Sequence, residues 1–107
     1  MTHRTVIVAK IEPGRQQEVA EIFGRSDATS LPHDLGVTGR SLYTLDDVYL
    51  HVIEFGVEPG PALQAAHQLP AFRKISDDLR PFISPYNPAT WRGPQDAVAT
   101  EFYRWHA

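Results

Sequence analysis

The chain has 107 residues, of which 42% are hydrophobic and 21% charged, and its net charge of −3 at pH 7 argues against nucleic acid as a partner. This length and composition predict a single globular domain over residues 1–107, with neither a signal peptide nor the roughly 20 apolar residues of a membrane span. Cysteine is absent, which excludes disulfides, a thiolate nucleophile and a cysteine-based metal site, and which suits a reducing cytoplasm.

The first part of the chain predicts a strand, a helix and a series of turns. Residues 5–11 form an apolar run with side chains for both faces of a sheet. Apolar residues at helical spacing then predict a helix that begins near Pro13 and runs to about Phe23, with Gly24 at its C-terminal end. Residues 26–39 are polar and rich in turn-forming residues.

Residues 40–45 and 48–55 predict the two strands of a hairpin, because both are rich in β-branched and aromatic residues. If the turn between them has two residues, Leu42 lies opposite His51. Arg40 then lies on the same face as His51, at the roughly 7–8 Å of a diagonal cross-strand pair. A three-residue turn would place Arg40 and His51 on opposite faces, so the register decides whether the two side chains meet.

The last part of the chain predicts two helical pieces and a closing strand. The first helical piece runs from Ala62 to about His67, and the second ends near Pro81. Residues 84–98 are rich in proline and lack periodicity, whereas residues 99–105 alternate and predict the last strand. The order β-α-β-β-α-β predicts a ferredoxin-like α+β fold, a four-stranded antiparallel sheet with helices on one face.

The predicted strands are apolar on both faces, for example Val6 and Val8 on one and Ile7 on the other. An antiparallel sheet with one face in water should instead alternate apolar and polar residues. We therefore expect the second face to be buried against another copy, in a homodimer packed sheet to sheet. The alternative is that residues 84–98 cover that face within one chain.

Arg40 and His51 share a predicted sheet face that is otherwise apolar, with Leu42, Tyr49, Ile53 and Phe55. A buried guanidinium is costly unless it is paired, so this pair indicates a site for an anion or oxyanion. Two alternatives stay open. His51 is a hydrogen-bonded core histidine, or Asp27, Asp34 or Glu12 reaches in to neutralise Arg40.

Three further features of the sequence each allow more than one interpretation. Asp27 and Thr29 fit turns or helix caps. Alternatively, the carboxylate of Asp27 has a function and orients His51 or holds substrate. Trp91 fits either an anchor that closes a pocket, which we favour, or a dimer contact. His51 and Glu54 have the spacing of helical metal ligands, but on a strand they point to opposite faces, so no metal is expected.

Several short motifs follow one another along nearly the whole chain: Ser26-Asp27-Ala28-Thr29, Leu31-Pro32, Gly36-Val37, Arg40, Asp47-Val48-Tyr49-Leu50-His51-Val52-Ile53-Glu54, Pro70-Ala71-Phe72, Pro85-Tyr86, Trp91-Arg92 and Phe102-Tyr103-Arg104-Trp105. In these motifs the sequence resembles the small aromatic polyketide cyclases of bacterial type II polyketide synthase clusters, the tetracenomycin F2 cyclase-like and spore-pigment-type group. The resemblance implies a dimeric α+β barrel with a pocket between sheet and helices. It also implies cofactor-free aldol condensation and dehydration of a poly-β-ketone or partly cyclised intermediate, free or carrier-bound.

Carried over by position, the resemblance implicates Asp27, Arg40 and His51 as catalytic groups. The substrate-binding candidates are Thr29, Leu42, Tyr49, Ile53, Phe72 and Trp91. Three positions depart from the pattern: Ser26, Ser30 and Leu69 stand where a histidine, a glutamate and a histidine occur in other members. Two other functions fit the same sequence, a cofactor-free monooxygenase of the same superfamily acting on an anthrone-like aromatic, and a chaperone-like subunit that shields a polyketide.

Overall fold

A computed structural model describes residues 3–66, 68–91 and 94–107 of the chain. In chain order the elements are β1 (His3–Ile11), α1 (Gln16–Asp27), α2 (Leu31–Leu35), β2 (Val37–Leu45), β3 (Val48–Phe55), α3 (Pro59–Ala66), α4 (Pro70–Leu79), β4 (Ile83–Pro85) and the 3₁₀ helix η1 (Pro94–Ala97). Helix α3 ends at Ala66, next to the expected end at about His67. His67 itself and Arg92 lie outside the described residues.

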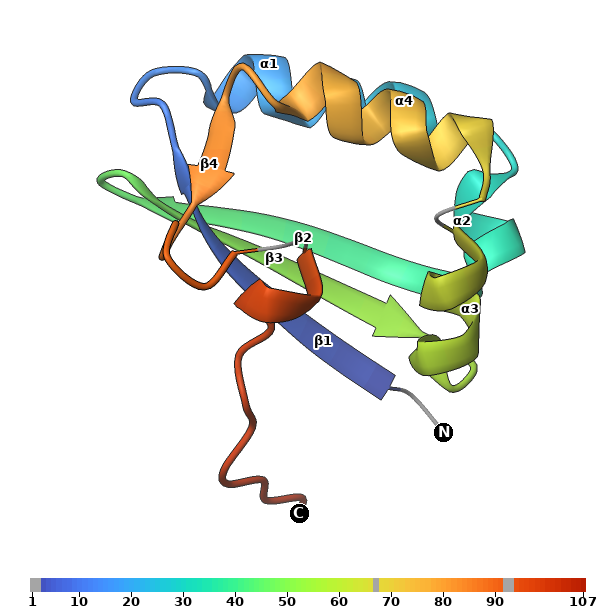
Figure 1. Cartoon of the computed structure of the whole chain (residues 1–107). Helices are drawn as coiled ribbons and strands as arrows, with labels where there is room; N and C mark the ends of the chain where they lie inside the picture. Colours follow the sequence, from blue (N-terminus) through green and yellow to red (C-terminus); the bar gives the residue numbers. More distant parts are fainter. Residues whose placement is uncertain (1–2, 67, 92–93) are drawn as a thin grey trace.

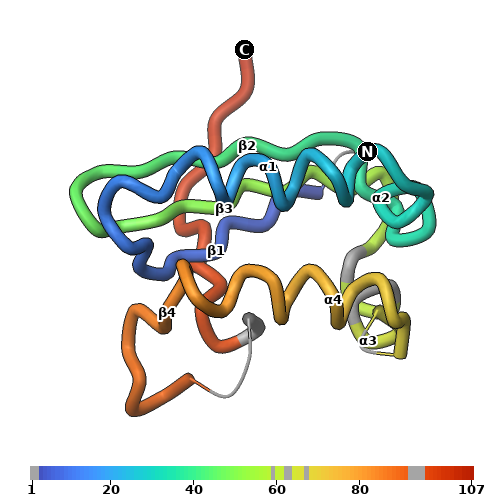
Figure 2. Tube along the Cα trace, turned by 90° about the horizontal axis from the view of Figure 1, so that it is seen from above, coloured from blue at the N-terminus to red at the C-terminus, as the bar shows by residue number. Residues whose placement is uncertain are grey.

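The sheet has the strand order β2-β3-β1-β4, and all its neighbouring strands are antiparallel. Helices α1 and α4 lie on one face of the sheet (Figure 1). Seen from above, α1 runs along β2 and β3, and α4 runs beside α1 on the β4 side (Figure 2). This arrangement confirms the predicted ferredoxin-like α+β fold.

The hairpin has the two-residue turn on which the predicted site depends. Asp46 has a φ of 54°, the left-handed conformation that tight hairpin turns require and that aspartate tolerates. In the resulting register, Leu42 lies opposite His51 and Arg40 lies opposite Ile53. Arg40 and His51 therefore share the helix-covered face, as predicted.

Helix α1 differs from the prediction at both ends. It begins at Gln16 and continues through Gly24 to Asp27, one turn beyond the expected end. Gly24 does not cap the helix, since the glycines with positive φ in the described part of the chain are Gly14 and Gly36. The helix continues because its last turn is fastened to the sheet by the side chain of Asp27.

The prediction that residues 99–105 form the closing strand is wrong. The fourth strand is β4, which pairs with Ala9–Ile11 of β1 and so occupies that length of the β1 edge. Further along this edge, Val98 pairs with Ile7 in an isolated bridge. The following segment, residues 100–107, has no regular secondary structure and is exposed.

The core lies between the helices and the sheet. Its largest buried cluster is Ala9, Ile11, Val19, Phe23 and Tyr49. On the opposite face, Leu50 lies between Val8 and Tyr43 in a row of directly paired apolar residues across β1, β3 and β2. Tyr86, Trp91 and Val98 line a cavity with Val8 at one end of this row, so part of the second face is covered, but Tyr43 is exposed.

Candidate functional site

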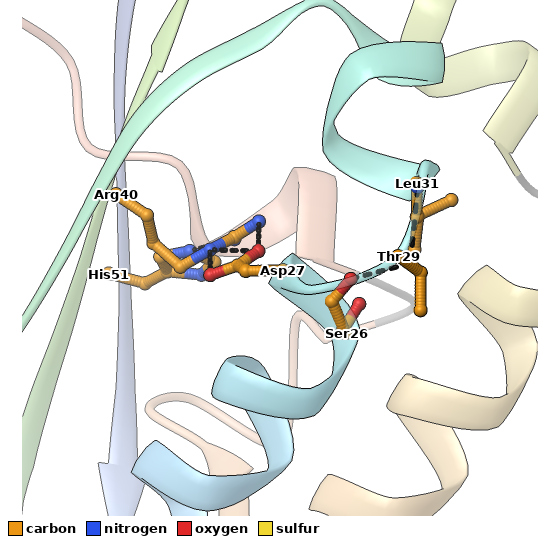
Figure 3. Close-up of polar contacts among 6 residues, drawn as sticks. All are labelled: Ser26, Asp27, Thr29, Leu31, Arg40 and His51. Carbon is orange, nitrogen blue, oxygen red and sulfur yellow. Dashed lines mark hydrogen bonds and ion pairs between the residues drawn. The ribbon is translucent and has the colours of Figure 1, made fainter.

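Arg40 projects from β2 into a polar cluster with Asp27 and His51 (Figure 3). Its Nε donates to both carboxylate oxygens of Asp27, at 3.2 and 3.1 Å, and its Nη2 donates to Oδ1 at 3.0 Å. Its Nη1 lies 2.7 Å from Nε2 of His51. The guanidinium is therefore held on two sides, by a carboxylate and by an imidazole.

Asp27 reaches Arg40 because it occupies the last position of α1, beside the face of the hairpin. Both alternatives that the sequence left open hold: His51 is buried and hydrogen-bonded, and Asp27 neutralises Arg40, whereas Asp34 and Glu12 have other partners. The arginine is thus a paired group. The Arg40 side chain is only 15% exposed, so its charge is largely buried. Pairing with a carboxylate relieves much of the free-energy penalty for that burial.

His51 is neutral at pH 7. It is only 7% exposed, and this burial, reinforced by the positive charge of Arg40, lowers its pKa to about 3. Arg40 can only donate, so Nε2 of His51 is the acceptor and carries a lone pair. The ring proton is consequently assigned to Nδ1.

Phe23 completes the cluster, and the sequence analysis did not recognise it as part of the site. The guanidinium carbon of Arg40 lies 4.9 Å from the centre of the Phe23 ring, within cation–π range. The Phe23 and His51 rings are tilted by 59° with centres 4.9 Å apart. A signal did exist: Phe23 precedes Asp27 by four residues, so the two share one face of the helix.

Two N–H groups of Arg40 remain available for a ligand. Arginine has five N–H donors, and here Asp27 takes those of Nε and Nη2 and His51 takes one of Nη1. Among the described residues no acceptor engages the second N–H of Nη1 or that of Nη2. The guanidinium that carries these donors is fixed in orientation and lies against the Phe23 ring, an arrangement that suits an oxyanion.

The apolar candidates divide between the cluster and its surroundings. Leu42, Tyr49 and Ile53 lie on the same sheet face as Arg40, as predicted. Burial raises the pKa of the Tyr49 phenol, although the charge of Arg40 opposes the rise, so Tyr49 stays protonated. Phe72 lies further along the helix layer, against the core cluster of Leu31, Leu35 and Ala66.

Thr29 acts as a turn former. Its hydroxyl donates to the Ser26 carbonyl oxygen at 2.6 Å and accepts the Leu31 N–H at 3.2 Å (Figure 3). These bonds link the end of α1 to the start of α2. Thr29 thereby orders the segment next to Asp27.

Trp91 is not brought to the cluster. It lines a cavity of about 350 Å³ with Tyr86 and Val8. Val8 points to the face of the sheet opposite His51, because the neighbouring Ile7 is the partner of His51. A second cavity, of about 260 Å³, lies between β4 and the β2–β3 turn and is also away from Arg40.

No group of three or more histidines, cysteines, aspartates or glutamates within the described residues is placed to hold a metal ion. In the same part of the chain, none of the helices combines the length and the hydropathy needed to cross a membrane. The described groups that offer chemistry to a ligand at the cluster are thus the polar side chains of Asp27, Arg40 and His51.

Comparisons with known proteins find relatives that span nearly the whole chain. Tetracenomycin F2 cyclase of Streptomyces glaucescens is 31% identical over 107 residues, covering 100% of this chain and 97% of that protein. Its solved structure, described as a type-II polyketide cyclase, matches with a TM-score of 0.90 and 30% identity over 98% of both chains. Polyketide synthase CurG of Streptomyces cyaneus is 45% identical over 103 residues, which are 96% of each chain.

A weaker likeness concerns the fold alone. SnoaB, a cofactor-independent oxygenase from Streptomyces nogalater, has a TM-score of 0.58 at 19% identity over 76% of this chain and 83% of that chain. By contrast, the family model for polyketide synthesis cyclases matches residues 3–106. This match confirms the resemblance found in the sequence, and the chain belongs to the polyketide synthesis cyclase family.

Proposed function

We propose that this polyketide cyclase closes an aromatic ring by intramolecular aldol condensation and loss of water, without a cofactor. Its substrate would be a poly-β-ketone or a partly cyclised intermediate. The observation that carries the proposal is the guanidinium of Arg40, held by Asp27 and His51 beside the Phe23 ring, with two N–H donors that no described residue engages. Aldol chemistry on ketones develops negative charge on oxygen, first in the enolate and then in the alkoxide.

Arg40 stabilises that charge in the proposed mechanism. A proton between two ketones is already acidic, so the enolate needs only modest assistance to form. The free N–H groups on Nη1 and Nη2 lie in the plane of the guanidinium, and they can donate to an enolate oxygen or to the oxygens of an enolised 1,3-diketone. Removing a donor of this kind typically lowers the rate about 10²–10³-fold.

His51 is the proposed proton carrier. Its Nε2 lone pair is engaged by Arg40 in the structure, and its pKa of about 3 makes it a weak base before substrate binds. An enolate forming against Arg40 draws the guanidinium toward itself and adds a negative charge beside the imidazole, which raises the pKa of His51. His51 takes the α-proton at Nε2 in the same step, as that charge develops, and returns it to the aldol alkoxide, a contribution of about 10²–10⁴-fold.

Asp27 acts on Arg40 rather than on His51 directly. Its carboxylate fixes the plane of the guanidinium, which decides where the free donors point. Its side chain is also 38% exposed, so one carboxylate oxygen can take an α-proton of the aldol while the hydroxyl group leaves as hydroxide into solvent. We assign it both the orientation of Arg40 and assistance to the loss of water.

The apolar side chains supply regiochemistry, because a poly-ketone cyclises unaided but indiscriminately. Leu42, Tyr49 and Ile53 would form the floor against which the flexible chain folds, with Phe72, Thr29 and Trp91 as the more distant lining. Holding the reacting carbons together contributes as much as the acid and base groups do. We further propose that the enzyme works in the cytoplasm. We also propose that it is a homodimer, since Leu50 and Tyr43 form part of an uncovered apolar sheet face.

Co-expression with a minimal polyketide synthase tests the proposal. Cells with the wild-type chain should give one ring pattern that cells without it do not, and the Arg40→Met variant should lose it. Arg4→Met is the matched control, because Arg4 is an exposed arginine paired with Glu54 on the other face of the sheet. An identical product mixture with and without the protein would contradict the proposal, and oxygen uptake by the pure protein would point to a monooxygenase instead.

A further inference from the structure

One buried side chain on the helix-covered face of the sheet carries a polar group without a partner. Tyr49 is only 3% exposed and belongs to the largest core cluster. Its hydroxyl makes no hydrogen bond with any residue that the structure describes. Burying a hydroxyl without a partner costs free energy, so a ligand that supplies the missing acceptor would bind favourably there.

The Tyr49 hydroxyl is accessible from solvent. Among the side-chain oxygens and nitrogens of the described residues, only Oε2 of Glu18 is both unpartnered and sealed from solvent. Part of the small exposed surface of Tyr49 therefore lies at its hydroxyl. Helix α4 packs over the same cluster with Ile75 and Leu79 but buries none of its residues, so the helix layer is loosely packed there.

Tyr49 lies next to His51 on the face of β3 that carries the site. The order along this face is Tyr49, His51 and Ile53. Arg40 pairs with Ile53 but reaches back to His51, with 2.7 Å between Nη1 and Nε2 (Figure 3). The ring centres of Tyr49 and His51 are 6.2 Å apart. Along the strand, His51 therefore lies between the levels of two residues that can donate, Tyr49 and Arg40.

The Tyr49 phenol is a hydrogen-bond donor at neutral pH. Burial raises its pKa, and the charge of Arg40 acts in the opposite direction, which places the phenol within electrostatic range of the guanidinium. The phenol therefore keeps its proton. A protonated hydroxyl in the field of a fixed positive charge is suited to an oxygen that becomes negative.

We propose that Tyr49 is a further catalytic residue, whose hydroxyl donates a hydrogen bond to the ketone oxygen that the enolate attacks. This inference rests on the proposed cyclase function and assigns a donor to the second of the two oxygens that gain charge in an aldol step. Arg40 holds the enolate oxygen in the proposed mechanism, so the attacked ketone needs a donor of its own.

The step balances with Tyr49 as a donor that keeps its proton. The enolate carbon forms the new carbon–carbon bond, and the π electron pair of the attacked ketone moves onto its oxygen. The resulting alkoxide takes the proton that His51 removed from the α-carbon. The hydrogen bond from Tyr49 strengthens as the negative charge develops, which lowers the barrier to ring closure.

The first test is Tyr49→Phe, which removes the hydroxyl and keeps the ring. In cells with a minimal polyketide synthase, the readout is the ratio of the ring pattern directed by the wild-type chain to the spontaneous products, at equal protein levels. This ratio should fall about 10²–10³-fold, because loss of one such donor typically lowers a rate by that factor. Tyr43→Phe is the matched control and should leave the ratio unchanged, since Tyr43 is an exposed tyrosine on the opposite face of the same sheet.

Urea unfolding of the same variants separates catalysis from structure. A hydroxyl without a partner in the fold contributes no hydrogen bond, so the unfolding midpoint of Tyr49→Phe should equal or exceed that of the wild type. A structural role predicts the reverse, a lower midpoint together with loss of the directed product. An unchanged product ratio or a lowered midpoint would each overturn the proposal.

The same experiment distinguishes failure of this proposal from failure of the proposed function. A wild-type chain that changes no product would contradict the cyclase function, and the role of Tyr49 with it. If the wild type directs one ring pattern and Tyr49→Phe directs it equally well, only the role of Tyr49 is contradicted.

Discussion

The neutral state of His51 has a consequence for stability that can be measured without any substrate. In the folded protein its pKa is about 3, compared with about 6.5 when unfolded, so the folded state resists protonation. The resulting stability is complete above pH 6.5 and is lost as the pH falls toward 3. At pH 4.5 the loss is about 2–3 kcal/mol, because each pKa unit corresponds to about 1.4 kcal/mol.

Urea unfolding at pH 7.5 and at pH 4.5 measures this loss directly. His51→Gln is the comparison, because an amide oxygen can still accept from Arg40 but the side chain does not titrate. Other acid groups affect both proteins equally, so the wild type should lose about 2–3 kcal/mol more than the variant between the two pH values. Equal losses would refute the burial of a neutral imidazole and the assignment of its ring proton.

Four further predictions concern other residues of the chain. Asp27→Asn removes the charge that fixes Arg40, so steady-state cyclisation should fall about 10–100-fold while the circular dichroism spectrum is unchanged. Phe23→Leu keeps the site apolar but removes the ring beside the guanidinium, so product analysis should show a broader mixture of ring patterns. Gly36→Ala should lower the unfolding free energy by about 1–3 kcal/mol, since φ is 75° and an added Cβ would lie 2.5 Å from a side chain. Gly24→Ala, in an open helical position, should instead raise it by up to about 1 kcal/mol in the same urea experiment.

The register of the hairpin could be predicted because it is determined locally. A two-residue turn and the alternation of side chains along a strand decide which residues share a face, and Arg40 and His51 followed from these rules. The partner of Arg40 could not be decided in the same way. Asp27 reaches it only because α1 continues one turn past Gly24, and local pattern had indicated that the helix ends there.

The closing strand was mispredicted for a different reason. Alternating residues such as those at 99–105 predict that a segment is suited to a sheet, but a strand also needs a free edge to pair with. β4 has only three residues and left no clear pattern in the sequence, yet it takes the Ala9–Ile11 length of the β1 edge, and Val98 bridges Ile7 further along.

Chemical rescue of an Arg40→Ala variant tests the central role of the guanidinium most directly. The rate of ring closure should fall about 10²–10³-fold and recover in part when free guanidinium ion is added, since the pocket left between Asp27 and His51 can bind it. Arg4→Ala should keep the wild-type rate, with or without the ion. If Arg40→Ala closed the same ring at the wild-type rate, the guanidinium would have no part in the reaction and the proposed mechanism would be wrong.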